Sequence, residues 1–145
     1  MPFELNMLVF QKEMPYNDPE VREIENAAAL GIATARGLAN VVSTIWRRNL
    51  ISDEVWTQLR DPVERGDDKV TGYGWHRGHG FFYHPHPTRK NAFLMLHGGH
   101  GMQNLVIDPY NKVVFALIRN GLLWDAKAFK ETTAFAESII KKCCS

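Results

Sequence analysis

The sequence predicts an α+β fold in which helices pack on an antiparallel sheet. Apolar residues recur at helical spacing over 34–60 and 125–142, and short apolar strands separated by turn residues occupy 71–120. The connection at 108–111 is short enough to require an antiparallel hairpin. With 145 residues the chain corresponds to one domain with its own core. We expect a single domain, preceded by an irregular lead-in over 1–33.

Composition excludes several functional classes. The chain is 45% hydrophobic and 23% charged, with a formal net charge of +1 and no basic block, so nucleic acid is not an expected partner. No apolar run approaches the length of a membrane span, and the N-terminal residues make a poor signal peptide. We expect a soluble protein of unknown compartment. The adjacent Cys143 and Cys144 weakly favour a reducing, cytoplasmic one.

Two helices are predicted in the first half of the chain. Thr34 caps a helix from Ala35 to about Arg48, and Ser52 caps a shorter helix that Pro62 ends. The residues expected to face inward are Leu38, Val41, Val42, Ile45 and Trp46 in the first helix, and Val55, Trp56 and Leu59 in the second. Residues 61–70 are predicted to be a solvated connection.

The strands follow. Glycines alternate with aromatic residues from Thr71, which predicts a strand pair or one irregular aromatic strand. Apolar strands are then expected at Ala92–Leu96, Leu105–Ile107 and Val113–Arg119, with Asn111 as the left-handed residue of the last turn. The last two strands are apolar at successive positions, so both sheet faces should be covered.

A C-terminal helix should cover one of these faces. Asp125 is its expected cap, and it should extend over about Ala126–Lys142. The predicted inward stripe is Phe129, Thr132, Ala136, Ile139 and Cys143.

The segment His97-Gly98-Gly99-His100-Gly101 carries the chemistry. It is predicted to bend the chain after an apolar strand, and its small residues would let a reacting carbonyl approach the backbone. Two plainer interpretations remain open: His97 bonds a backbone carbonyl at a strand end, or the glycines form a β-bulge.

Histidine pairs also suggest a metal site. The pairs are His76/His79, His84/His86 and His97/His100. Pro85 interrupts the second pair, and no carboxylate or cysteine clusters with any of them in the sequence, so we expect neither a metal nor another cofactor. The aromatic run of Trp75, Phe81, Phe82 and Tyr83 is interpreted as core packing.

The order of these segments resembles a known family. NDPEVREIENAAALGIATARGLANVVSTI, then GYGW, HGGHG, IDPYNKVVFALIRN and a last helix resemble the C-terminal part of the serine β-lactamase-related family. That family includes class C-like β-lactamases, penicillin-binding proteins and esterases of the same fold. The likeness extends from about Asn17 to the C-terminus and is closest to the esterase-like branch, whose third motif reads His-x-Gly.

The resemblance implies a partial domain. The Ser-x-x-Lys nucleophile motif and the Tyr-x-Asn or Tyr-x-Ser motif of this family would lie upstream of Met1. The sequence has no Tyr-x-Asn, and its one Ser-x-x-Lys, at Ser138–Lys141, is interpreted as a coincidence. We therefore expect the C-terminal segment of a serine hydrolase, acting on a small ester or amide and inactive alone.

The resemblance also assigns site residues. His97 and Gly99 stand at the first and last positions of the His-x-Gly motif, and the backbone N–H of His100 would be an oxyanion donor. Gly98 would leave space for substrate. The alternative is a non-catalytic relative that acts as an interaction module, binding itself or a partner through an exposed sheet edge.

Overall fold

The computed structural model describes residues 15–26, 31–69, 72, 74–121 and 126–143. The chain divides into two compact units, residues 1–33 and 34–145. The described part of the first unit holds a 3₁₀ turn, η1 (Pro15–Asn17), and a one-turn helix, α2 (Pro19–Arg22). The Asp18 side chain caps α2 by accepting a hydrogen bond of 2.9 Å from the Glu20 backbone N–H.

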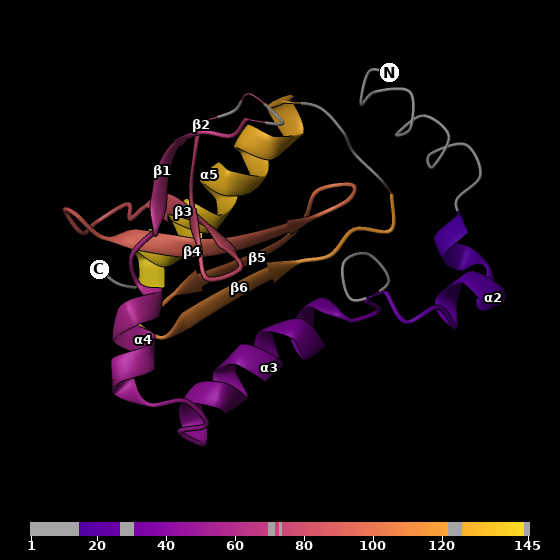
Figure 1. Cartoon of the computed structure of the whole chain (residues 1–145), viewed down its shortest axis with the longest axis horizontal. Coiled ribbons are helices and arrows are strands. Elements are labelled where there is room, and N and C mark those ends of the chain that lie inside the picture. Colours follow the sequence, from indigo (N-terminus) through magenta and orange to yellow (C-terminus); the bar gives the residue numbers. More distant parts are fainter. Residues whose placement is uncertain (1–14, 27–30, 70–71, 73, 122–125, 144–145) are drawn as a thin grey trace. The chain divides into compact units, whose positions relative to one another are not determined.

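The second unit is built on one six-stranded sheet. Its helices are α3 (Ala35–Arg47), α4 (Asp53–Leu59) and α5 (Ala126–Cys143), and its strands are β1 (Glu64–Asp67), β2 (Gly74–Gly78), β3 (Phe81–Pro85), β4 (Phe93–Gly99), β5 (Gln103–Asp108) and β6 (Val113–Leu117). The strands lie in sequence order, and every neighbouring pair is antiparallel. This arrangement, visible in Figure 1, confirms the predicted α+β fold class.

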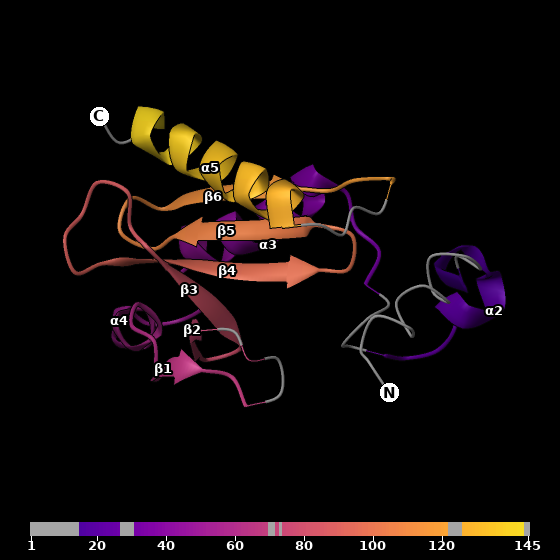
Figure 2. The same ribbon diagram turned by 90° about the horizontal axis from the view of Figure 1, so that it is seen from above.

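Helices cover both faces of the sheet. Figure 2 shows α5 on one face and α3 on the other. Alternation along β4 explains this, because Leu94 and Leu96 pack with α5 whereas Met95 between them packs with α3 and α4. The continuous apolar runs of the central strands therefore indicated two covered faces correctly.

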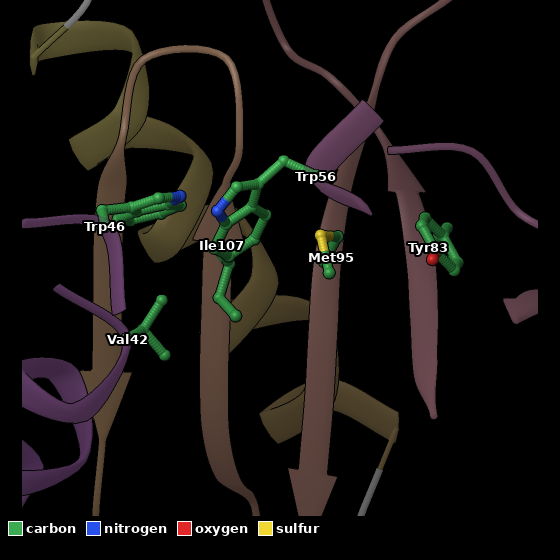
Figure 3. Close-up of a cluster of buried hydrophobic side chains, with 6 residues drawn as sticks. All are labelled: Val42, Trp46, Trp56, Tyr83, Met95 and Ile107. Atoms are coloured by element: carbon green, nitrogen blue, oxygen red, sulfur yellow. The ribbon is translucent and has the colours of Figure 1, made fainter. Parts of the chain in front are cut away.

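The larger core cluster lies between the sheet and helices α3 and α4. Its buried members, drawn in Figure 3, are Val42, Trp46, Trp56, Tyr83, Met95 and Ile107. The rings of Trp46 and Trp56 lie 5.0 Å apart, which joins the two helices. The Tyr83 hydroxyl donates a hydrogen bond of 2.9 Å to the Leu59 carbonyl at the end of α4. This bond ties α4 to β3.

Both predicted helix starts are correct. Thr34 Oγ1 accepts a hydrogen bond from Gly37 N at 3.0 Å, and Ser52 Oγ accepts one from Val55 N at 3.4 Å. Two of the residues expected to face inward are exposed instead: Val41 at 59% and Val55 at 41%. Each lies one residue before a buried residue, about 100° away around the helix, so the sheet covers a narrower stripe than the apolar pattern suggests.

The buried stripe of α5 also differs from the prediction. Ala128, Thr132, Ala136 and Ile140 are buried, in steps of four residues, whereas Cys143 is exposed and Ile139 is only half-buried. A step of four keeps these side chains on one ridge that packs into the sheet. The predicted cap Asp125 and the side chain of Phe129 lie outside the described residues.

Residues 61–70 were predicted to be a plain connection, and this is wrong because they include strand β1. Glu64 pairs with Arg77 and Asp67 with Gly74, which makes β1 an edge strand. All four β1 residues are exposed. A strand without buried side chains leaves no hydrophobic alternation in the sequence, so the pattern could not reveal it.

The region from 74 to 85 forms a strand pair, one of the two predicted possibilities. His79 and Gly80 join β2 to β3 with positive φ angles of 54° and 81°, the pattern of a two-residue type I′ hairpin turn. In the β5–β6 turn the left-handed residue is Lys112, with φ 56°, and not Asn111 as expected. Asn111 instead donates its backbone N–H to Asp108 Oδ1 at 3.1 Å.

Candidate functional site

His97 lies on the exposed half of strand β4. The strand runs from Phe93 through Gly99, so His97 and the two glycines belong to it and the chain bends only afterwards. This differs from the prediction of a bend that begins at His97. The pairing with β3 ends at Phe82↔Leu96, whereas the pairing with β5 continues to Gly99↔Gln103. The last three residues of β4 therefore extend past β3 on one side.

A cavity of about 560 Å³ opens at this place. Its lining residues come from β1, from the β2–β3 hairpin and from β4: Val63, Glu64, Arg77, Gly78, His79, Gly80, Phe81, Phe82 and His97. Of the four predicted site residues, all of which the structure describes, His97 alone lines it. Gly98 and Gly99 are exposed on the same strand, and His100 begins the following turn. The four residues thus remain contiguous, but one of them faces this cavity.

The walls of this cavity combine apolar surface with a neutralised cation. Val63, Phe81 and Phe82 supply the apolar part. Arg77 donates from Nε to Glu64 Oε2 at 3.0 Å and from Nη1 to Asp68 Oδ2 at 2.6 Å. Because two carboxylates already balance this guanidinium, the wall does not attract anions strongly.

A close backbone approach shapes the rim of the cavity. A Cβ at Gly78 would lie 2.7 Å from Val63 N and 2.9 Å from Val63 Cγ2. Val63 N also donates a hydrogen bond of 3.0 Å to Arg77 O. Glycine at 78 is therefore what lets the chain before β1 lie against the hairpin.

Of the predicted site residues, His97 is the one that brings a hydrogen-bonding side chain to the cavity. An exposed neutral imidazole can both donate and accept a hydrogen bond. The three serines that the structure describes are used elsewhere: Ser43 Oγ donates to Ala39 O at 3.0 Å, Ser52 caps α4, and Ser138 Oγ donates to Phe135 O at 2.8 Å. None of the three lines the cavity.

The Ser-x-x-Lys match lies on α5. Ser138 is exposed there, and Lys141 Nζ lies 3.6 Å from Glu137 Oε2. A nucleophilic serine needs a base within hydrogen-bond reach and a pocket for substrate. Ser138 Oγ instead donates to a carbonyl of its own helix.

The two histidines of the second pair have different partners in the structure. His84 Nε2 lies 2.7 Å from Glu137 Oε1 on α5, whereas His86 Nε2 lies 3.1 Å from Asp108 Oδ2. Each of these two histidines thus has a carboxylate partner from a distant segment of the chain, which the local sequence does not indicate. Within the described ranges, no group of three or more His, Cys, Asp or Glu residues has the arrangement of a metal site.

The His86–Asp108 pair is a structural element. Both side chains are fully buried. Backbone N–H groups of Thr88 and Arg89 donate to His86 Nδ1 at 3.2 and 3.1 Å, so the Nε2 proton is the one that points to Asp108. The pair joins the loop after β3 to the end of β5. Since no solvent reaches it, we assign it no catalytic role.

Several cavity residues could not be foreseen from the sequence. Val63 and Glu64 fall in the segment expected to be a connection, and Arg77 carries no motif. From the sequence, Phe81 and Phe82 are interpreted as core residues, and His79 is assigned no role. The one available signal was the His79-Gly80 turn, which places 78 and 81 opposite each other at a hairpin tip.

Comparison with known proteins gives one match. The family model described as Beta-lactamase matches residues 6–137 of this chain. No curated protein and no solved structure matches this chain. Among the helices that the structure describes, none has the length and apolar character needed to cross a membrane.

Proposed function

Since the chain belongs to the beta-lactamase family, we propose that it forms the substrate-binding strand of a serine hydrolase that cleaves small esters or amides through an acyl-enzyme. The observation that carries the proposal is the exposed His97 on β4, facing a cavity of about 560 Å³. We assign the chain to the esterase-like, His-x-Gly branch on the basis of His97-Gly98-Gly99.

Two groups of this strand act on the substrate. The His97 ring donates a hydrogen bond to the bound ester or amide, and the His100 backbone N–H donates to the oxyanion as the carbonyl carbon becomes tetrahedral. A second oxyanion donor comes from the nucleophilic serine. One such donor contributes about a hundredfold or more in rate. Gly98 leaves the strand without a side chain where the substrate lies.

The serine and its base lie outside residues 1–145. This part of the proposal is supported by the engagement of Ser43, Ser52 and Ser138 in helix hydrogen bonds away from the cavity. The chain by itself therefore binds but does not turn over substrate, because the remaining groups give only residual stabilisation of the transition state.

A second candidate function is a non-catalytic interaction module. It is favoured by the exposure of Val41 and Val55, which lie on helices with an apolar pattern and would be covered by a partner or by a second copy. Sedimentation of the chain at increasing concentration separates the two: a concentration-dependent dimer that Val41→Ser abolishes supports the module.

The kinetic test uses the protein translated from the complete gene. We expect His97→Ala to lower kcat/KM for a p-nitrophenyl ester by about tenfold to a hundredfold. The matched control is His84→Ala, which removes a half-exposed histidine of β3 that bonds Glu137. Unchanged turnover in His97→Ala contradicts the role assigned to that ring. An equal loss in the control means that the loss is not specific to His97.

A further inference from the structure

Gln103 is the first residue of β5 and follows directly after the turn that begins at His100. We propose that Gln103 is a positioning residue, which fixes the β4–β5 turn and with it the direction of the His100 backbone N–H. The inference rests on the proposed function, in which that N–H binds the oxyanion. Three sets of contacts support it.

The first set joins the Gln103 side chain to the strand beyond β5. Its Nε2 donates to Arg119 O at 3.2 Å, and its Oε1 accepts from Arg119 N at 2.7 Å. The β5–β6 pairing ends at Asn104↔Leu117, so the side-chain amide supplies the next two bonds of the ladder. It satisfies both backbone groups of Arg119 where β6 has ended.

The second contact is with β4. Gln103 lies opposite Gly99, and a Cβ at Gly99 would be 3.2 Å from Gln103 Cβ and 3.5 Å from Cγ. The Gln103 side chain thus fills the space that a side chain at 99 would need. Local packing therefore explains the glycine at 99. A Cβ at Gly98 would meet nothing nearer than Gln103 O, at 4.0 Å.

The third set anchors Arg119. Its Nη2 donates to Thr132 Oγ1 at 3.2 Å, and Thr132 Oγ1 donates to Ala128 O at 2.8 Å. Thr132 is 3% exposed, on the ridge of α5 that packs against the sheet. Strand pairing at Gly99↔Gln103 and these hydrogen bonds together connect the end of β4 through Gln103 and Arg119 to α5.

The turn needs such support because its backbone is strained. Gly101 and Met102 have φ angles of 79° and 67°. A left-handed conformation is unfavourable for a residue with a side chain such as methionine, so surrounding contacts must hold Met102 in it. An oxyanion donor must be held within about 0.5 Å of its productive position. Gln103 joins the end of this turn to the segment after β6 through its two hydrogen bonds to Arg119.

The structural test uses ¹⁵N relaxation on chain 1–145. Gln103→Met keeps the Cβ and Cγ that pack on Gly99 but removes both bonds to Arg119. We expect the order parameters of His100 and Gly101 to fall from about 0.85 to about 0.6 or below, while those of Met95 and Ile107 stay unchanged. Gln58→Met, at an exposed position of α4, should change neither. Unchanged order at His100 in folded Gln103→Met overturns the inference. If Gln103→Met does not fold, Gln103→Glu takes its place, because it keeps the acceptor for Arg119 N and loses only the donor to Arg119 O. We expect the order parameters of His100 and Gly101 in Gln103→Glu to fall below those of the wild type. Order parameters equal to the wild type would overturn the inference.

The kinetic test uses the translation product of the complete gene. Gln103→Met should lower kcat by about tenfold with KM changed by less than about twofold, because only transition-state binding is lost. Gln103→Glu should recover part of this loss. If His97→Ala is impaired and Gln103→Met is not, the inference fails and the proposed function stands. If neither variant is impaired, the proposed function fails and the inference fails with it.

Discussion

Asp108 is fully buried, and its carboxylate is surrounded by hydrogen-bond donors. Burial raises the pKa of Asp108, but hydrogen bonds from the Asn111 side chain and backbone N–H and from His86 outweigh it, so the pKa lies below its ordinary value. A carboxyl whose pKa is lowered by folding stabilises the native state above its unfolded pKa of about 3.9. That contribution is lost as pH falls from there through the folded pKa.

Replacing Asp108 by asparagine removes the charge from this buried carboxyl. At pH 7 we expect the free energy of unfolding to fall by about 1–3 kcal/mol, because the charge-assisted bonds to His86 and Asn111 are weakened. Urea unfolding from pH 7 to pH 2 should show the wild-type advantage shrinking below about pH 4. An advantage that stays constant over this range would contradict the pKa argument.

The hairpin of β2 and β3 shapes the cavity, and at Gly78 it comes closest to the chain before β1. Gly78→Ala would place a Cβ 2.7 Å from Val63 N, which is backbone and cannot rotate away. We expect a loss of about 1–3 kcal/mol in unfolding free energy and separation of β1 from the hairpin. Gly31→Ala is the control, since nothing lies within 4 Å of that position. Equal stability of the two variants in thermal unfolding would show that β1 does not pack as described.

Helix α5 gives a second prediction at this scale. Ile140 is 0% exposed and packs against Leu94, Leu96 and Val106, whereas its neighbour Ile139 is half-buried. Ile140→Ala should cost about 2–5 kcal/mol through the cavity that it leaves. Ile139→Ala should cost clearly less. Denaturant unfolding of both variants decides which of the two isoleucines faces the sheet.

The elements differ in how well the sequence predicted them. Capping residues are local signals, and Thr34 and Ser52 begin their helices as expected. Which residues of a helix are buried depends on the partner surface, so Val41, Val55 and Cys143, which were expected to face inward, are exposed. Strand β1 has no buried side chain and gave no signal at all.

At the scale of the whole molecule, the fold class and the family were accessible from the order of segments, because that order follows the sheet strand by strand. The cavity was not accessible, because it forms where β1, the hairpin tip and β4 meet in space. Motif inspection selected His97 from that set. It could not select the cavity residues Arg77 and Phe81, nor Gln103 outside the cavity, because their positions depend on strand pairing.

The central claim is that this chain supplies the substrate wall for a nucleophilic serine located outside residues 1–145. The most direct measurement is to treat the translation product of the complete gene with a fluorophosphonate probe and locate the adduct by tandem mass spectrometry. We expect an adduct on a single serine outside residues 1–145, and no labelling of chain 1–145 alone. An adduct on Ser138, or no adduct on any serine, would contradict it.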